Sequence, residues 1–446
     1  MNNAKRIWEP FLDWHGIWPG ATGYEEDGRA WVSDSPQGVK LSVQQAEKSE
    51  PVLTPDQPWE EGCVNYANVV YEDGRYRLWY ATVGWKGGGC LCYADSADGL
   101  HWEKPNLGLY ERNGSKANNI VYHKGIQGSV FRDPSASEAE RYKLVDMQST
   151  ARYRGRVVRG TEMARVTREL VDKGLTGAEI YGRELQLLGE VIGAVSPDGL
   201  RWTRIEEPLF DKFCDTQNVV FYDEELGRYV GYWRTSVGNR RAIARSETDD
   251  FRHWPLPDTV LAPDSQTPPT DDYYTTAYSR YPGAGRGIHL MFPSIYYRDR
   301  DTLDIHLAVS GDGLNWTWPE RVPIIPLGPD GSGENGCIYA CPGLFSLGQD
   351  RWGLLLQCRD KRHNERKHAP GTDKCHYSWA MWKRDRLVAL EASTEGQLTL
   401  SRRGASEALT EGQVNLSRPG PRGPSKGLIF DGGKMLLNYK TARNGW

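Results

Sequence analysis

Acidic side chains recur at five places in the sequence, each at or near the start of a run with the composition of a β-strand. These positions are Glu61, Asp133, Asp215, Asp272 and Glu334. If folding brings several of them into one pocket, their charges repel, and at least one carboxyl group keeps its proton near neutral pH. A protonated carboxyl beside an ionised one is the pair that cleavage of a glycosidic bond requires. The pattern therefore indicates acid–base chemistry on a sugar.

We assign catalytic roles to three of these acids, two of them from the residues adjacent in the sequence. Arg132 precedes Asp133 and would keep that carboxylate ionised, which suits stabilisation of positive charge on a sugar ring. Glu334 has no cation adjacent in sequence, so we expect it to be the general acid. Asp215 is then the expected nucleophile or base. The predicted catalytic set is Asp133, Asp215 and Glu334.

Further polar and aromatic residues, near the same strand starts or on the second strands of the units, are expected to contact the substrate. Tyr and Trp suit sugars because they combine a flat apolar face with a hydrogen-bonding edge, although core packing or a salt bridge is the alternative for each such residue. The predicted substrate-binding residues are Arg132, Asp272, Tyr274, Glu61, Asn65, Trp233 and Arg359.

Metal and cofactor chemistry has no support in the sequence. Cys337 and Cys341 lack a second pair or a His at zinc-site spacing. We therefore expect no metal, no cofactor and no disulfide framework, and we expect the eight cysteines to be buried free thiols.

One phrase recurs in the chain and indicates how these residues are positioned. It appears as Ser96-Ala-Asp-Gly-Leu-His-Trp102, as Ser196-Pro-Asp-Gly-Leu-Arg-Trp202 and as Ser310-Gly-Asp-Gly-Leu-Asn-Trp316. A looser copy, Ser246 to Trp254, has two extra residues before its Trp. Each copy follows an apolar or alternating run, so each predicts a strand, an Asp-Gly turn and a further strand. Recurrence at intervals is the signature of a repeat architecture.

The repeats divide the middle of the chain into similar units of about four short strands each. A period of roughly 40–50 residues with four strands per unit is typical of a propeller blade. We therefore predict an all-β fold, a five-bladed β-propeller. Its expected units cover about 58–105, 118–204, 210–262, 266–326 and 333–392.

Three other segments complete the predicted organisation around a propeller at 59–392. Residues 1–58 are Trp-rich and irregular, and we expect a lead-in segment that packs on the propeller. Residues 160–188 interrupt the second unit with a helical stripe that Gly174 would end, which predicts a helical insertion. Residues 393–446 are expected to form a C-terminal β-sandwich-like module, incomplete because its strands lack partners in the sequence.

Bulk composition argues against several classes of function. The net charge of −4 with 26% charged residues does not indicate nucleic acid or an anionic membrane as a partner. No apolar run reaches the roughly 18 residues that a membrane span needs, and the first residues carry no signal-peptide pattern. Carbohydrate remains the expected partner, and the oligomeric state stays open.

Three stretches resemble known families. Val130-Phe-Arg-Asp-Pro134 resembles the Arg-Asp-Pro motif of the invertase, levanase and fructosidase family, whose arabinanase and β-xylosidase neighbours share a five-bladed fold. The stretches Asp98–Gly108 and Asn113–Asn119 are similar to a bacterial group identified as glycosyl hydrolase family 32-like. The resemblance implies a propeller with a C-terminal β-sandwich, and a transition-state-stabilising role for Asp133.

The chain departs from that family at its first unit. The invertase family places its nucleophile in an Asn-Asp-Pro-Asn stretch, whereas Cys63-Val-Asn-Tyr-Ala-Asn68 contains no Asp, and the Glu-Cys motif around the family's acid is also missing. We therefore expect the catalytic pair on other units, and fructoside specificity is not implied.

Three functions stay open on the sequence alone. The first is a glycoside hydrolase acting on an oligo- or polysaccharide. The second is a non-catalytic carbohydrate-binding propeller, in which the carboxylates only accept hydrogen bonds from hydroxyl groups. The third is a glycoside phosphorylase, which would need a cluster of Arg, Lys and His to hold phosphate beside the sugar. The sequence shows no clear cluster of that kind.

Overall fold

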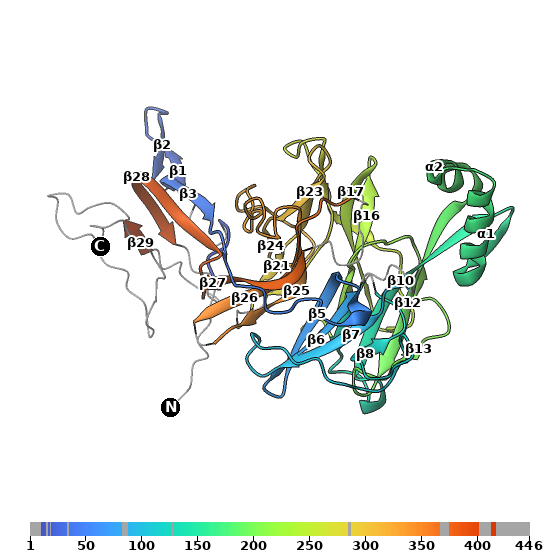
Figure 1. The fold of residues 1–446 in the computed structure, drawn as a ribbon. Helices are drawn as coiled ribbons and strands as arrows, with labels where there is room; N and C mark the ends of the chain where they lie inside the picture. The colour runs from blue at the N-terminus through green and yellow to red at the C-terminus, as the bar shows by residue number, and fades with distance from the viewer. Residues whose placement is uncertain are drawn as a thin grey trace.

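The computed structural model describes residues 10–400, apart from 15–16, 18, 34, 83–87, 127, 284–286, 349 and 366–373, together with residues 412–415. Strands make up almost all of its regular structure, so the all-β prediction is confirmed. Figure 1 shows the sheets gathered in the middle of the molecule, with one projection at the N-terminal strands and another at the helices.

Three sheets match the first three expected units. The first runs in the order β5 (Val64–Glu72), β6 (Arg75–Thr82), β7 (Leu91–Ser96), β8 (Ile120–Tyr122). The second joins β9 (Val130–Arg132), β10 (Tyr142–Tyr153), β11 (Arg156–Arg159), β12 (Gln186–Ser196), β13 (Thr203–Arg204) and β14 (Phe210–Asp211). The third runs in the order β15 (Val219–Asp223), β16 (Arg228–Val237), β17 (Arg240–Thr248), β18 (Asp258–Leu261).

Hydrogen bonding joins the fourth and fifth expected units into one seven-stranded sheet. Its order is β19 (Asp271–Tyr273), β22 (Ser294–Tyr297), β23 (Thr302–Ile305), β25 (Cys337–Ser346), β26 (Arg351–Arg359), β27 (Cys375–Lys383), β4 (Glu47–Lys48). A three-stranded sheet accompanies it, made of β20 (Tyr278–Arg280), β21 (His289–Met291) and β24 (Ala308–Ser310). The joint is a parallel pairing of Leu303 with Cys337. The propeller-like array thus has four blade-like sheets, and the prediction of five is wrong because spacing along the chain cannot reveal a lateral pairing.

Four strands, which we call the inner strands, link neighbouring sheets: β5, β9, β15 and β25. Strand β5 contacts β9 on one side and β25 on the other, and β9 also contacts β15. At the far ends of β5 and β9, the guanidinium of Arg132 contacts the Glu72 carboxylate at 2.6 Å. The opposite ends, where the inner strands begin, therefore define the other mouth of the array.

The repeated phrase forms the predicted turn in all three strict copies. Gly99, Gly199 and Gly313 have φ between 71° and 77°, in the left-handed region that favours glycine. In each copy the Asp carboxylate accepts two backbone amides of the turn at 2.7–2.8 Å.

Each of these turns also receives a hydrogen bond from a different sheet. The indole N–H of Trp379 donates to the carbonyl of Gly99 at 2.7 Å, and that of Trp79 donates to Gly199 at 2.6 Å. The hydroxyl of Tyr232 donates to Gly313 at 2.8 Å. The repeat therefore fastens neighbouring sheets together, because an aromatic donor of one sheet satisfies the turn carbonyl of the next.

The N-terminal segment pairs with the last part of the propeller. Strand β4 adds to the edge of β27 through Lys48 opposite Ala380. A separate sheet runs in the order β29 (Gly412–Asn415), β28 (Val388–Leu400), β3 (Gln37–Val43), and β1 (Ala21–Tyr24) pairs with β2 (Ala30–Ser33). Most of the predicted C-terminal module, 401–411 and 416–446, lies outside the described residues.

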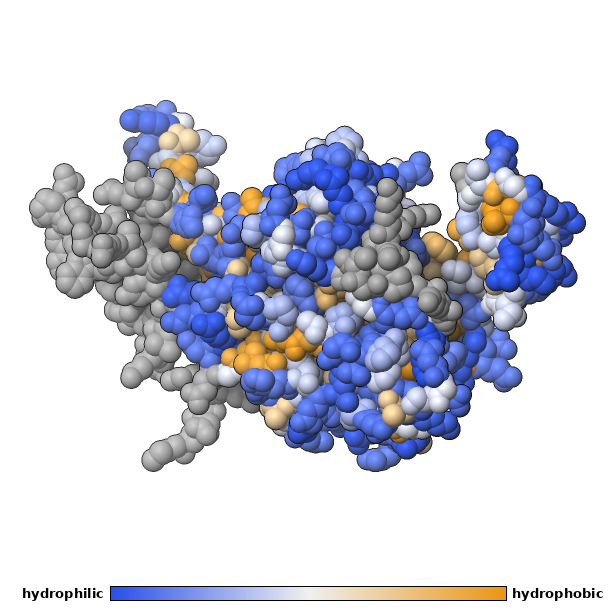
Figure 2. Space-filling model, viewed as in Figure 1, coloured by the Kyte–Doolittle hydropathy of each residue, from blue (hydrophilic) through white to orange (hydrophobic). Residues whose placement is uncertain are grey.

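A helical excursion interrupts the second sheet where the sequence predicts it. It contains α1 (Gly160–Asp172) and the short α2 (Gly177–Glu179), followed by a π-helical turn at Ile180–Glu184. Gly174, with φ of 85°, follows the end of α1 as expected. The buried side chains of the excursion form a small core of their own, made of Ala151, Tyr153, Val158, Val166, Leu170, Ile180 and Leu185. Figure 2 shows further apolar atoms on its surface.

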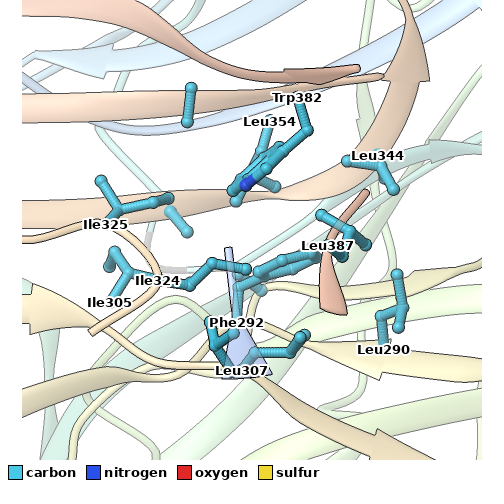
Figure 3. Close-up of a cluster of buried hydrophobic side chains, with 14 of the residues drawn as sticks. Leu290, Phe292, Ile305, Leu307, Ile324, Ile325, Leu344, Leu354, Trp382 and Leu387 are labelled. Carbon is cyan, nitrogen blue, oxygen red and sulfur yellow. The ribbon is translucent and has the colours of Figure 1, made fainter. Parts of the chain in front are cut away.

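The largest apolar core lies within the seven-stranded sheet and its companion. Figure 3 shows its side chains converging from several strands. Phe292 and Trp382 stack there with ring centroids 6.2 Å apart. No helix among the residues described combines the length and the apolar character needed to cross a bilayer.

Candidate functional site

Tyrosines fill the axis of the array where the inner strands begin. Tyr66 of β5 and Tyr339 of β25 lie edge to face with ring centroids 5.9 Å apart, and Tyr274 lies 6.0 Å from Tyr339. The hydroxyl of Thr216 lies 3.5 Å from the Tyr66 hydroxyl and donates to the carbonyl of Tyr274 at 3.3 Å. Residues from distant parts of the chain therefore meet here, above a buried aromatic floor.

Asp215 lies beside this floor, just before β15. Its carboxylate is 3.4 Å from Nη1 of Arg234, and the same nitrogen donates to the Asp215 carbonyl at 2.8 Å. The Asp215 side chain keeps 40% of its surface exposed, which leaves the carboxylate accessible to a ligand. This is the predicted catalytic residue that the structure places at the axis.

Arg241 extends the site from the start of β17. Its guanidinium carbon lies 3.8 Å from the ring centroid of Tyr274, and its Nη1 donates to the Asp215 carbonyl at 3.4 Å. A guanidinium over an aromatic face is a favourable cation–π arrangement. Tyr274 is thus at the predicted site, but Arg241 covers a face that we expected to stack on sugar.

His363 closes another side of the site. Its ring lies 4.7 Å from that of Tyr274, and its Nδ1 lies 2.9 Å from the Tyr339 hydroxyl. Burial, followed by the charge of Arg241, lowers the pKa of His363 to about 4, so the imidazole is neutral at neutral pH. Arg359 of β26 pairs in register with Cys337, two positions before Tyr339 on β25, and its charge contributes to that lowered pKa. We call Asp215, Arg234, Arg241, Tyr274 and His363 the axial cluster.

Sequence reasoning missed Arg241 and His363 as members of one site. The available signal was the pair Arg240-Arg241, which begins β17 directly after the hairpin turn at Gly238 and Asn239. Strand alternation places only one side chain of such a pair on a given face. The meeting of Arg241 with His363, 122 positions further along, follows from the closed array and is not visible in local patterns.

No contact in the described part of the chain joins Glu334 to the axial cluster, and two cationic side chains flank its carboxylate. Nζ of Lys48 is 2.5 Å from its carboxylate, and Nε2 of His376 is 3.5 Å away. Burial opposes ionisation of Glu334, but the contacts with His376 and Lys48 outweigh it and lower its pKa. A lowered pKa is the reverse of what a general acid needs near neutral pH, so the reasoning that chose Glu334 is corrected.

Asp133 is a buried carboxylate that accepts hydrogen bonds from neighbouring side chains. It follows β9 at the end away from the axial cluster, and its side chain is completely buried. Its carboxylate accepts the Tyr229 hydroxyl at 2.7 Å and the Ser135 hydroxyl at 2.7 Å. Arg132 beside it is ion-paired with Glu72. No described contact joins Asp133, Asp215 and Glu334 to one another, and each carboxylate has partners of its own.

The other predicted binding residues hold the scaffold. Asp272 is buried, accepts two bonds from Arg298 at 2.8 and 3.1 Å, and accepts the Arg241 amide at 3.0 Å, so it positions the start of β17. Trp233 has no exposed surface, and its indole N–H donates to Ser246 at 2.9 Å. It is a core residue, which corrects its predicted contact with sugar.

Glu61 and Asn65 lie in the first sheet region. The Glu61 carboxylate is 3.4 Å from the guanidinium of Arg112, and the residue has a left-handed backbone with φ of 50°. Asn65 lies on β5 beside a bulge, and its carbonyl accepts the Tyr377 hydroxyl. No contact in the described part of the chain joins either side chain to the axial cluster.

The cysteines and one group of potential metal ligands can also be located in the structure. All eight cysteines are buried and free, as predicted. Glu334, Cys358 and His376 bring their ligand atoms within 4.8 Å of one another. The Lys48 ammonium lies 2.5 Å from the Glu334 carboxylate. The positive charge that balances Glu334 therefore comes from a lysine side chain.

Two grooves lie elsewhere on the surface. One of about 560 Å³ follows α1 and is lined by Met163, Val171 and Tyr181 among others. The other, of about 790 Å³, is lined by residues that include Tyr71, Phe345 and Met381. Neither contains a predicted site residue.

Comparison with known proteins gives likenesses to solved structures only. No protein family and no curated protein matches the chain. An α-L-arabinofuranosidase from Podospora anserina in complex with cellotriose is similar over 77% of this chain and 98% of its own, at 11% identity and a TM-score of 0.46. An N-acetylgalactosamine deacetylase from F. plautii is similar over 79% and 97%, at 13% identity and 0.44. A sucrose-6-phosphate hydrolase from Lactobacillus gasseri is similar over 81% and 62%, at 11% identity and 0.44.

Proposed function

We propose that the protein is a carbohydrate-active enzyme that cleaves a glycosidic bond at the axial cluster, with Asp215 as its essential carboxylate. The observation that carries the proposal is the position of Asp215, which is exposed at the centre of the array and held between Arg234 and the tyrosine floor. In a hydrolase this carboxylate either attacks the anomeric carbon as a nucleophile or, as a base, removes a proton from the water that attacks it.

The surrounding groups suit that role. The hydrogen bond from Arg234 to the Asp215 carbonyl fixes the backbone that carries the carboxylate, so the group is held in place before substrate arrives. The neutral imidazole of His363, held by the hydroxyl of the buried Tyr339, offers a hydrogen-bonding position beside the aromatic floor. Such groups can hold ring hydroxyls of a sugar.

Replacing Asp215 by Asn tests the proposal. Glycoside turnover, measured on a panel of aryl glycosides and oligosaccharides, is expected to fall by about 100-fold or more. Sugar affinity, measured by calorimetry, should change little because the amide retains a hydrogen-bonding oxygen.

The matched control is Asp249→Asn, which removes an exposed carboxylate from the same sheet at a distance from the axis. It should leave turnover unchanged. If the wild type binds sugars but cleaves none of the panel, the non-catalytic binding function replaces this proposal.

A further inference from the structure

Two guanidinium groups converge on one point of the axial cluster. Nη1 of Arg234 and Nη1 of Arg241 both donate to the carbonyl of Asp215, at 2.8 and 3.4 Å. The two groups come from adjacent antiparallel strands, β16 and β17. Like charges held this close repel, so an anion that lies beside both groups is stabilised by them.

The protein supplies part of that negative charge. Asp215 lies 3.4 Å from Arg234 and compensates one guanidinium. In the described part of the chain no carboxylate lies within 4.0 Å of Arg241, whose guanidinium rests instead on the Tyr274 ring. Burial, followed by the charge of Arg241, lowers the pKa of Arg234, which agrees with incomplete compensation. The neutral His363 adds no negative charge.

We propose that Arg234 and Arg241 form an oxyanion subsite beside Asp215, which takes either inorganic phosphate or the acid group of a sugar. This inference rests on the proposed function because it names the chemical class of ligand that the same site accepts. Arginine is suited to the task, since its planar donors can bind two oxygens of a phosphate or a carboxylate together.

The two sources of the oxyanion imply different reactions. With phosphate, the C1–O bond of the glycoside breaks while a bond forms between C1 and a phosphate oxygen. The products are a sugar 1-phosphate and an alcohol, and the proton that hydrogen phosphate loses ends on the leaving oxygen. With an acidic sugar, the subsite only positions the substrate, and water is the second reactant.

Calorimetric titration with inorganic phosphate, with galacturonate and with galactose tests the subsite without requiring turnover. We expect the wild type to bind phosphate or galacturonate more tightly than neutral galactose. Arg241→Gln should weaken oxyanion binding by about tenfold or more, and Arg241→Lys by less because the charge remains.

Arg228→Gln is the matched control. Arg228 begins the same strand as Arg234, but it pairs with Glu247 and Asp249 at the other end. Circular dichroism checks each variant for folding, and Arg234→Gln replaces Arg241→Gln if the latter does not fold. Absence of oxyanion binding by the wild type, or equal weakening in Arg228→Gln, overturns the inference.

Activity assays then distinguish inorganic phosphate from an acidic sugar as the source of the oxyanion. Cleavage that requires phosphate and yields a sugar 1-phosphate identifies phosphate. Faster cleavage of a uronide than of its neutral counterpart without phosphate, lost in Arg241→Gln, identifies an acidic sugar. If oxyanions do not bind but Asp215→Asn still abolishes cleavage of neutral glycosides, only the subsite is refuted. If oxyanions bind but Asp215→Asn retains turnover, only the catalytic role of Asp215 is refuted.

Discussion

Glu334 and Lys48 form a largely buried ion pair between residues 286 positions apart. Their side chains are 12% and 20% exposed, so removing one charge leaves the other poorly solvated. Glu334→Gln should lower the free energy of unfolding by about 3 kcal/mol at neutral pH, measured by urea denaturation, with turnover per folded molecule unchanged. Loss of turnover at full stability would instead restore the catalytic role first predicted for Glu334.

Glu47, the residue before Lys48, offers a control for the Glu334→Gln substitution. Glu47 pairs with Arg351 at 3.3 Å on the surface, where its side chain is 78% exposed. Glu47→Gln should therefore change stability by less than about 0.5 kcal/mol.

The ion pair of Glu334 with Lys48 makes the free energy of unfolding depend on pH. The pKa of Glu334 is lower in the folded protein than its ordinary value of 4.5, so the carboxylate binds protons more readily when the chain unfolds. Its contribution is complete above about pH 4.5 and is lost as the pH falls through the folded pKa. The wild type should therefore lose more stability than Glu334→Gln between pH 5 and about pH 3.

At this scale the sequence predicted part of the site. Asp215 and Tyr274 are predicted from their places near strand starts, and the structure places both in the axial cluster. The surroundings of Glu334 and Asp133 could not be predicted from the sequence. Their partners Lys48 and Tyr229 lie far away in sequence, and a contact between distant residues leaves no local pattern.

At the scale of elements, the repeated turn carries two constraints at its glycine. Gly199 has φ of 75°, and a Cβ there would lie 2.6 Å from the Trp79 ring. Gly74, in the hairpin between β5 and β6, has φ of 77° with nothing within 4 Å of its Cβ position.

Gly74→Ala should therefore show the backbone effect alone, about 1 kcal/mol of lost stability. Gly199→Ala should lose about 3 kcal/mol because the indole must also move and its hydrogen bond is disturbed. Thermal unfolding measures both. Equal losses would mean that the turn does not fasten the first sheet to the second.

The Asp-Gly phrase predicted the turn itself, because Asp capping and a left-handed glycine are local effects. It could not predict that Trp379, Trp79 and Tyr232 bind the turn carbonyls, since those donors belong to other sheets. The helical excursion was predicted because an amphipathic stripe and its terminating glycine are also local.

At the scale of the whole molecule, the N-terminal segment closes the array. The Ser49 amide donates to the Trp379 carbonyl at 2.9 Å, and the Trp379 amide donates to the Ser49 hydroxyl at 2.9 Å. Trp379 in turn reaches the Gly99 turn of the first sheet.

Ser49→Pro removes the backbone donor, and it should lower stability by about 2–3 kcal/mol more than Ser49→Ala, which removes only the side-chain acceptor. Differential scanning calorimetry measures the difference. Equal effects of the two substitutions would show that β4 adds little to the closure.

The overall fold was predictable as a repeat of small sheets, and the count of sheets was not. Spacing of the phrase defined the units, but one lateral pairing between Leu303 and Cys337 merged two of them. Such pairings depend on how the sheets meet in space, which periodicity along the chain does not encode.

The excursion of the second sheet has a practical consequence for protein engineering. It leaves the ladder of β10 and β12 at Arg152 opposite Gln186, and it packs around its own apolar side chains. A reporter or affinity tag could therefore be spliced in at this junction, or the whole excursion exchanged for a short Asn-Gly loop. Because that junction is on a different sheet from Asp215, such grafts offer a way to immobilise or label the protein while its chemistry is assayed.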